Sequence, residues 1–222
     1  MISELTTNAL LDLTKTAAAG LFTGDEYPWT VLPKIGEFIV ALGKTLPSDL
    51  FEERGTNIWV AKSATVAPSV HITGPCIIDE GAEVRHCAFI RGKVLIGKGA
   101  VAGNSVELKN AILFDGAQVP HYNYVGDSIL GHKAHLGAQA LTSNVKSDRR
   151  LTSVKHGDTV LETGLKKFGA IVGDFAEVGC STVLNPATVI GRHTNIYPLS
   201  SVRGTVAADR IYKNQDEIVV KR

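Results

Sequence analysis

An aliphatic residue recurs every six positions through most of this 222-residue chain. Counting in sixes from Val60 meets the following residues: Val66, Ile72, Ile78, Val84, Ile90, Ile96, Ala102, Leu108, Phe114 and Pro120. The repeat resumes at Leu130 and Leu136, and again from Val172 to Val202. A period of six matches neither an α-helix nor a β-hairpin, but it is the period of a parallel β-helix whose hexads each form a short strand and a corner. The sequence therefore predicts a mainly β chain folded as a parallel β-helix of hexapeptide repeats.

A second inward position, mostly occupied by small residues, follows each repeat residue by four positions. Its first occupants are Ala64, Val70, Cys76, Ala82, Ala88, Val94, Ala100, Val106 and Ile112. Three hexads close one triangular coil, so residues eighteen apart should stack on neighbouring coils, with backbones ~5 Å apart. From Pro120 to Leu130 the chain advances ten residues where two hexads need twelve. We therefore expect the coil that contains His121 and Asp127 to be two residues short and locally concave.

The segments outside the repeat divide the chain. Residues 1–56 lack it, and their apolar spacing predicts one helix that ends near Gly20 and another from about Pro33 to Leu42. We interpret residues 1–56 as a helical cap on one end of a β-helix formed by residues 57–208. The tail, residues 209–222, is expected to cover the other end.

A long charged excursion, residues 144–168, interrupts the β-helix. Long loops on a rigid scaffold are usually functional or contact a neighbouring subunit. The alternative is a flexible insertion without a role.

Composition excludes several classes of protein. The formal net charge is +1, which gives no global attraction for nucleic acid or an anionic membrane. No apolar run approaches the ~20 residues of a membrane span, and the N-terminus lacks the pattern of a signal peptide. The three cysteines show no close pairing, which disfavours a disulfide framework and indicates a cytoplasmic protein.

Two basic residues occupy corner positions that normally hold small or acidic residues. Arg91 and Lys109 are eighteen apart and should stack on successive coils. Two like charges at that separation need neutralisation, either by Glu107 and Asp127 or by a bound anion such as phosphate, which arginine binds in bidentate fashion. The alternative is a solvated, salt-bridged face.

A histidine occupies a similar corner position at His121, with Asn123 and Tyr124 close by. The imidazole of a histidine can act as a general base near neutral pH. A zinc site made from His121, His132 and His135 is the competing interpretation.

Two motifs within residues 103–144 point to a known family. They read Glu107-x-Lys109 and His121-x-x-Tyr124-x-Gly126-Asp127. With the surrounding hexads, roughly residues 60–205 resemble the acetyltransferase half of the bifunctional glucosamine-1-phosphate acetyltransferase/UDP-N-acetylglucosamine pyrophosphorylase family. The resemblance implies a left-handed β-helix, a homotrimer, and acetyl-CoA bound between neighbouring β-helices. It also implies acetyl transfer to an amino sugar 1-phosphate.

The resemblance assigns roles to individual residues. It implies that His121 is the general base, that Arg91 and Lys109 bind the sugar phosphate, and that Tyr124 contacts the same substrate. Asn144 would hold the substrate and shape the acyl site. The backbone near Ala138 and Cys180 would bind acetyl-CoA.

Some positions depart from that family. His135 stands where the family has a substrate-contacting asparagine, and Arg150 stands near a substrate-binding lysine; we keep both as candidate substrate contacts. The spacing of His132 and His135 also departs from that of zinc-dependent β-helix enzymes, so no metal is expected to be required. Residues 1–56 do not resemble the family's nucleotidyl-binding domain, so pyrophosphorylase activity is not expected. The alternative function is a non-catalytic protein that binds a sugar phosphate or nucleotide sugar and partners a nucleotidyltransferase.

Overall fold

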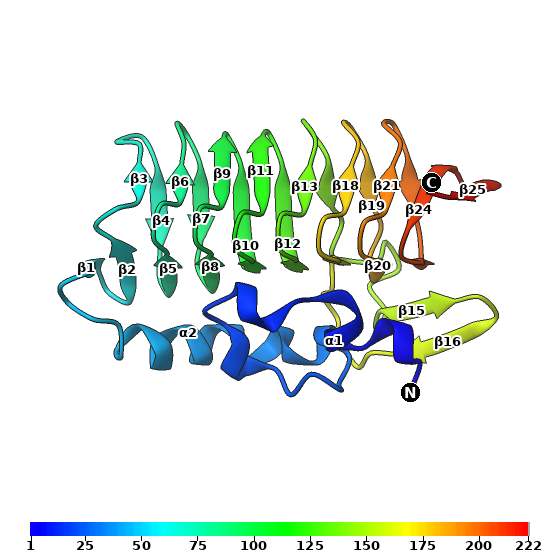
Figure 1. Cartoon of the computed structure of the whole chain (residues 1–222), viewed down its shortest axis with the longest axis horizontal. Coiled ribbons are helices and arrows are strands. Elements are labelled where there is room, and N and C mark those ends of the chain that lie inside the picture. The colour runs from blue at the N-terminus through cyan, green and yellow to red at the C-terminus, as the bar shows by residue number, and fades with distance from the viewer. Residues whose placement is uncertain (222) are drawn as a thin grey trace.

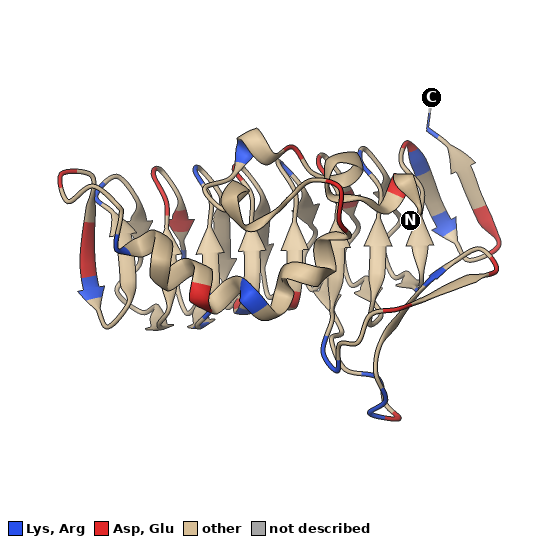
Figure 2. Ribbon diagram, turned by 90° about the horizontal axis from the view of Figure 1, so that it is seen from below, with Lys and Arg blue, Asp and Glu red and all other residues tan. Residues whose placement is uncertain are grey.

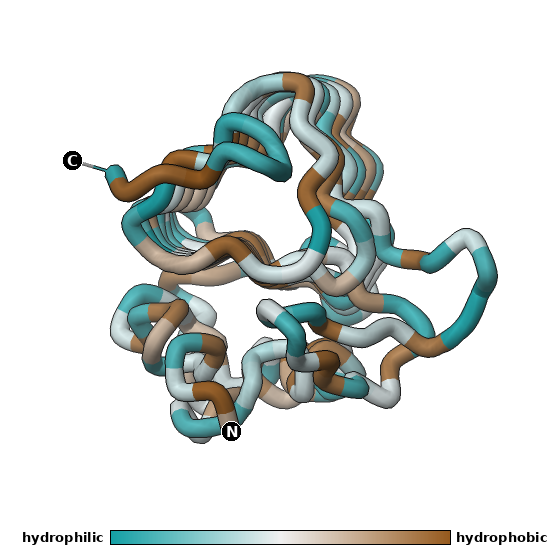
Figure 3. The backbone as a smooth tube through the Cα atoms, turned by 90° about the vertical axis from the view of Figure 1, so that its right-hand side faces the viewer, coloured by the Kyte–Doolittle hydropathy of each residue, from teal (hydrophilic) through white to brown (hydrophobic). Residues whose placement is uncertain are grey.

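The computed structural model describes residues 1–221 and is a left-handed parallel β-helix with a triangular cross-section (Figures 1 and 3). Its three faces are named here in the order in which the chain meets them. Face 1 comprises β2 (Ile58–Ala61), β5 (Cys76–Ile78), β8 (Val94–Ile96), the second halves of β10 (Glu107–Leu113) and β12 (Tyr124–Leu130), β17 (Ala170–Val172), β20 (Thr188–Ile190) and β23 (Thr205–Val206). The predicted mainly β fold, a parallel β-helix of hexapeptide repeats, is therefore confirmed.

The other two faces complete each coil. Face 2 comprises β3 (Thr65–Val66), β6 (Glu83–Val84), β9 (Val101–Asn104), β11 (Gln118–His121), β13 (His135–Leu136), β18 (Glu177–Val178), β21 (Asn195–Ile196) and β24 (Arg210–Asn214). Face 3 comprises β4 (His71–Thr73), β7 (Phe89–Arg91), the first halves of β10 and β12, β14 (Leu141–Thr142), β19 (Val183–Leu184) and β22 (Ser201–Val202). Each corner is named by the two faces that it joins, so the 2–3 corner follows the strands of face 2 and the 3–1 corner follows those of face 3.

The two missing residues are real, but only one of them, at Asp127, lies between Pro120 and Leu130, where the sequence predicts both. In β8, β10 and β12, Val94 pairs with Ala111 and Ala111 with Ser128, so each of two successive coils has seventeen residues. The 3–1 corner is a single residue in both coils, Asn110 and then Asp127, with left-handed φ values of 48° and 49°. Asparagine and aspartate tolerate this conformation better than most residues. The segment from Gln118 to Tyr124 keeps the regular spacing.

This placement corrects the predicted core after Lys109. Leu113 and Val119 point into the β-helix, whereas the sequence count had put Phe114 and Pro120 there. Ile112 and Phe114 instead lie on the outer surface of face 1, against the N-terminal segment. The six-residue count from Leu108 fails because the next inward residue, Leu113, comes after five residues.

The N-terminal segment lies along face 1 and does not cap an end, so that expectation is wrong (Figures 1 and 3). The strands of face 1 turn a row of apolar side chains outward, and residues 1–46 bury it. The row consists of Trp59, Ile77, Leu95, Ile112, Ile129, Ile171 and Val189. Burying such a row is strongly favourable, at roughly 25 cal/mol per Å² of apolar surface.

The predicted first helix is mostly wrong, and the second is confirmed. Only α1 (Thr7–Leu10) is α-helical in the first stretch, and it is flanked by 3₁₀ turns at Ser3–Leu5, Leu13–Lys15 and Ala19–Leu21. The backbone N–H of Asp12 donates to the carboxylate of Asp174 at 2.7 Å, a contact that ties this stretch to the β-helix instead of to a helical turn. A 3₁₀ segment, Pro28–Lys34, leads into α2 (Ile35–Gly43).

The ends of the β-helix are closed by antiparallel strands. At one end β1 (Phe51–Gly55) pairs with β2, and at the other β25 (Glu217–Val220) pairs with β24. β24 is itself the last strand of face 2, so the β-helix extends past residue 208, and β25 pairs with the free edge of β24. No helix among residues 1–221 is long and apolar enough to cross a membrane.

The excursion contains an ordered hairpin, β15 (Ser153–His156) and β16 (Thr159–Glu162). His156 fastens it, because its Nε2 lies 2.9 Å from Glu4 Oε1 and its Nδ1 lies 3.0 Å from Thr205 Oγ1. The hairpin is thus anchored to the N-terminal segment and to the last coils of the same chain. Figure 2 shows acidic and basic residues interspersed along the molecule, without a face of one sign.

Candidate functional site

Six polar residues lie along face 3 and at its 3–1 corner, in two hydrogen-bonded groups: Arg91 with Glu107, and Lys109 with Asp127, Asn144 and Tyr124. This charged cluster consists of Arg91, Glu107, Lys109, Tyr124, Asp127 and Asn144. β10 pairs with β7 in a register that sets Leu108 beside Ile90. Lys109 therefore lies beside Arg91 on the next coil, as the spacing of eighteen predicts.

Arg91 is paired with a carboxylate from the neighbouring coil. Its guanidinium donates a hydrogen bond to Glu107, which raises the pKa of Arg91 above its usual value. The guanidinium also lies 5.8 Å from the centroid of the Phe89 ring, within cation–π range. Arg91 remains largely exposed, so its outer N–H groups stay accessible to a ligand.

Asp127 is the centre of the cluster. Lys109 Nζ donates to both of its carboxylate oxygens at 3.0 Å, and Asn110 Nδ2 donates at 2.9 Å. Asn144 Nδ2 donates to the same carboxylate. Asp127 is only 4% exposed, so four hydrogen bonds satisfy a buried charge. The short corner matters here, because it turns the Asp127 side chain toward Lys109.

Tyr124 lies over Gly126 and reaches Asn144. A Cβ added at Gly126 would meet the Tyr124 hydroxyl at 2.4 Å, so only glycine leaves room for the ring. Asn144 Nδ2 donates to the Tyr124 hydroxyl at 3.1 Å, and burial raises the pKa of Tyr124. The phenol therefore stays neutral and keeps its proton for donation to a ligand.

The cluster opens into a cleft of about 200 Å³ beside the N-terminal segment. Its lining residues are Leu32, Pro33, Gly74, Pro75, Arg91, Gly92, Lys93, Lys109, Asn110 and Asp127. Both neutralising carboxylates that the sequence suggested are in place, so the salt-bridged alternative is realised in part. The sequence pattern did not indicate Lys93, Asn110 or the wall formed by Leu32 and Pro33 as part of the site.

His121 lies at the 2–3 corner, at the opposite edge of face 3 from Asp127. Its backbone N–H donates to Asn123 Oδ1 at 3.0 Å, but its exposed imidazole makes no hydrogen bond to any described residue. Asn123 itself is buried and donates to the carbonyls of Gly137 and Ala140 at 2.8 Å, which fixes the corner.

The two candidate acetyl-CoA positions share this corner with His121. The backbone N–H of Gln139 donates to the His121 carbonyl at 3.0 Å, and that of Ser181 donates to the Ala138 carbonyl at 2.8 Å. His121, Ala138 and Cys180 are therefore stacked on successive coils. Cys180 is exposed.

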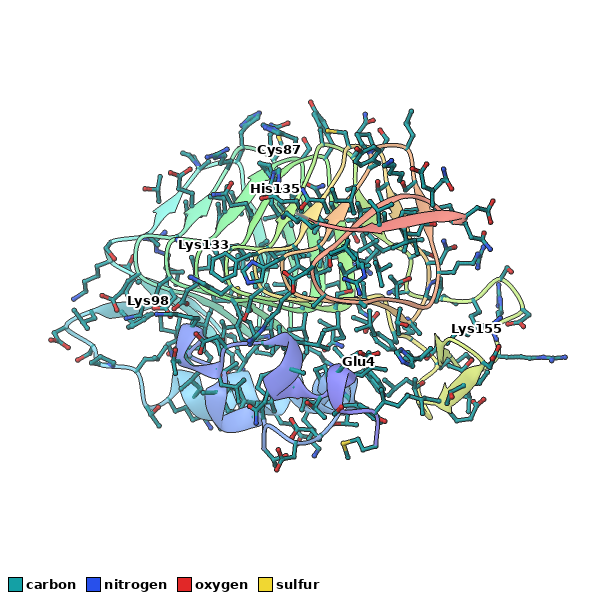
Figure 4. The ribbon with its side chains drawn as sticks, turned by 45° about the vertical axis from the view of Figure 1, so that its right-hand side comes forward. Glu4, Cys87, Lys98, Lys133, His135 and Lys155 are labelled. Atoms are coloured by element: carbon teal, nitrogen blue, oxygen red, sulfur yellow. The ribbon has the colours of Figure 1, made fainter. Side chains whose placement is uncertain are left out.

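His135 and Arg150 lie apart from the charged cluster. His135 is on face 2, where its Nδ1 lies 2.8 Å from Glu177 Oε2. Arg150 is on the excursion, with a side chain that is 83% exposed and 4.0 Å from Asp148. Figure 4 shows His135 on the coils, away from the N-terminal segment, and Lys155 on the hairpin of the same excursion. The structure therefore does not bring these two candidates to the charged cluster.

The candidate zinc histidines are engaged separately. His132 Nδ1 lies 2.6 Å from the carbonyl of Asp115, while His135 pairs with Glu177. Among residues 1–221, no group of three or more His, Cys, Asp or Glu side chains is arranged to hold a metal ion.

Comparison with known proteins gives one matching family model, the GMPPB C-terminal domain, which covers residues 72–163. The bifunctional protein GlmU of Methanococcus vannielii is 28% identical over 184 residues, or 75% of this chain and 44% of that protein. A bifunctional sugar-1-phosphate nucleotidylyltransferase/acetyltransferase of Sulfurisphaera tokodaii is 30% identical over 167 residues, or 67% of this chain and 41% of that protein. Among solved structures, a mutant of the N-acyltransferase AntD from Bacillus cereus, in complex with dTDP-4-amino-4,6-dideoxyglucose and coenzyme A, is 13% identical with a TM-score of 0.37, and the match covers 75% of this chain and 81% of that one.

These matches confirm the resemblance to hexapeptide-repeat proteins of the bifunctional nucleotidylyltransferase/acetyltransferase type. The chain spans less than half the length of the two curated relatives named above. The activities of those longer proteins are therefore not assigned to this chain by similarity alone.

Proposed function

We propose that this chain is an acetyl-CoA-dependent N-acetyltransferase whose acceptor is an amino sugar 1-phosphate. The observation that carries the proposal is the charged cluster on face 3, with His121 at the opposite edge of the same face. Arg91 and Lys109 offer N–H groups for an acceptor phosphate, and Tyr124 offers a hydroxyl over Gly126, beside Lys109. The sugar ring would lie across face 3, with its amine toward His121.

The reaction needs no covalent enzyme intermediate. The amine nitrogen attacks the thioester carbonyl, so that an N–C bond forms and the C–S bond breaks. His121 takes the proton from the attacking amine, and that proton then neutralises the departing thiolate of CoA. Holding both substrates at one corner supplies proximity, and backbone N–H groups of the corner can stabilise the oxyanion.

The proposed acetyl-CoA site is the 2–3 corner, along the stack of His121, Ala138 and Cys180. In a homotrimer this corner would face a neighbouring β-helix, and the groove between subunits would hold the cofactor. No metal is assigned to the reaction. Nucleotidyl transfer is not assigned either, because residues 1–46 form short helices and turns that pack on face 1.

The proposal is tested by release of free thiol from acetyl-CoA. We expect thiol release to depend on an amino sugar 1-phosphate such as glucosamine 1-phosphate, and mass spectrometry should show the N-acetylated sugar. The same sugar with a hydroxyl in place of the amine is the control and should release none. Absence of turnover with every amino sugar phosphate tried would refute the proposal.

Cysteine labelling tests the proposed cofactor site independently of turnover. Burial raises the pKa of the Cys76 thiol to about 12, so a thiol reagent should label only Cys87 and Cys180 in the native protein. Saturating acetyl-CoA should slow labelling of Cys180 by about tenfold or more. Cys87, an exposed thiol near the same corner in an earlier coil, is the internal control and should react at an unchanged rate. Equal rates at Cys180 with and without acetyl-CoA would remove this corner as the cofactor site.

A second candidate is a non-catalytic protein that binds a sugar phosphate or nucleotide sugar beside a nucleotidyltransferase. One observation favours it: no side chain among residues 1–221 makes a hydrogen bond that would orient the imidazole of His121 as a general base. This candidate predicts calorimetric binding of the sugar phosphate without binding of CoA.

A further inference from the structure

We infer that the preferred acceptor carries a nucleoside diphosphate on its anomeric carbon, in place of a single phosphate. This inference rests on the proposed function and names the class of acceptor for the same site. It follows from a third basic residue at the charged cluster and from a groove that continues the cleft along α2.

The third basic residue is Lys93, at the two-residue 3–1 corner just after Arg91. Arg91 is paired with Glu107 and Lys109 with Asp127, whereas the ammonium of Lys93 pairs with no carboxylate among residues 1–221. Its stem lies across α2, because a Cβ added at Gly36 would come within 3.0 Å of Lys93 Cγ. A single phosphate bound by Arg91 and Lys109 leaves this charge unused, and a second phosphate would satisfy it.

The groove along α2 begins where the cleft ends. It encloses about 480 Å³ and shares Pro33, Pro75 and Lys93 with the cleft of the charged cluster. Gly36, Val40 and Ala41 give it a small, apolar floor on the helix, with Glu37 and Lys44 as polar groups at its sides. Its volume falls in the range of small-molecule sites, and a mixed apolar and polar lining suits a nucleoside.

These parts occur in one order across the molecule. His121 stands at the 2–3 corner, and Tyr124 begins the strand of face 3 that follows. Arg91 ends β7 and Lys109 ends the first half of β10 on the same face, Lys93 stands at the 3–1 corner, and the groove along α2 lies beyond it. A nucleoside-diphosphate sugar has the matching order of amine-bearing sugar, first phosphate, second phosphate and nucleoside. A sugar 1-phosphate would leave Lys93 and the α2 groove empty.

The experiment compares kcat/KM for one amino sugar presented in two forms, as its 1-phosphate and as its uridine diphosphate derivative. We expect wild type to prefer the diphosphate form by about tenfold or more, the effect of one additional charged contact. Lys93→Met should lower kcat/KM for the diphosphate form about tenfold and bring the ratio near one. Ala41→Trp, at an exposed position in the groove, should do the same by filling it. Lys34→Met removes a nearby lysine that lines neither cavity and should leave the preference intact.

The inference is overturned if wild type uses both forms equally, or if neither Lys93→Met nor Ala41→Trp changes the preference. Absence of acetyl transfer with either form would refute the proposed function and not this inference. Calorimetry then decides: tighter binding of the uridine diphosphate form, lost in Lys93→Met, supports the diphosphate site, and equal or absent binding overturns it.

Discussion

Replacing His121 with alanine is expected to lower kcat for acetyl transfer by about 10²- to 10⁴-fold, the usual contribution of a general base. His121 is exposed at the 2–3 corner, and its side chain makes no hydrogen bond to any described residue, so its removal should not disturb the fold. KM for both substrates should change little, because phosphate binding is assigned to Arg91 and Lys109. Steady-state kinetics and a thermal melt of the same preparation check both statements.

The matched control is His86→Ala. His86 is an exposed histidine at the same corner, two coils earlier, where it bonds Ser69 Oγ at 2.6 Å and lies outside the proposed site. Its replacement should leave kcat unchanged. If His121→Ala turns over as fast as wild type, the chemistry belongs to another residue or the chain only binds its ligand. His132 and His135 are poor substitutes, since one is held by the Asp115 carbonyl and the other by Glu177.

The six-residue period predicts the architecture because it is a local rule repeated many times. Each hexad gives independent evidence that one of its residues points inward, so a wrong assignment at one corner does not change the predicted fold. The period does not say where a hexad is shortened. At Leu108 the count of six passes to Phe114, while the chain turns at Asn110 one residue earlier and places Leu113 inside. An asparagine and an aspartate seventeen apart, at Asn110 and Asp127, were the available signal for such tight corners.

Flanking segments are harder to predict because their structure depends on what they cover. Leu5, Leu10 and Leu11 suggest a helical face, but each is buried against face 1 in a chain of turns. The apolar residues that the N-terminal segment covers, such as Ile77 and Leu95, are the middle residues of their strands. They point outward and so do not occupy the inward hexad positions. The wall that Leu32 and Pro33 give the cleft was therefore invisible until the N-terminal segment was placed.

Some residues of the candidate site could be predicted from the repeat, whereas others could not. Arg91 and Lys109 were predicted as a stacked pair from spacing alone, and the pairing of β7 with β10 places them so. As candidate substrate contacts, His135 and Arg150 came only from the resemblance to a family, and neither lies near the charged cluster. A resemblance assigns a role to a residue by its position in the sequence. Whether that residue contacts the other site residues depends on the face of the β-helix on which it lies.

Replacing Asp127 with asparagine is expected to lower the free energy of unfolding by about 2–3 kcal/mol. Removing one partner of a fully buried ion pair costs roughly 3–5 kcal/mol, and the smaller figure applies because the Lys109 side chain is 24% exposed. Asparagine keeps the left-handed corner but leaves the Lys109 ammonium without a counter-ion. For a chain of this size the loss corresponds to a fall in Tm of about 5–10 °C, measured at one protein concentration.

The surface pair of Lys146 and Asp148 provides the matched control. It joins the same two residue types at 3.6 Å, with side chains that are 36% and 47% exposed, so Asp148→Asn should cost at most about 0.5 kcal/mol. A double-mutant cycle isolates the pairwise term: Asp127→Asn combined with Lys109→Met should be less destabilised than the sum of the single variants. KM for the acceptor should rise in Asp127→Asn, because Lys109 is then free to leave the position in which it meets the phosphate. If Asp127→Asn costs no more than Asp148→Asn, the four hydrogen bonds to Asp127 do not hold the site together, and the order of Arg91, Lys109 and Tyr124 must come from the coils alone.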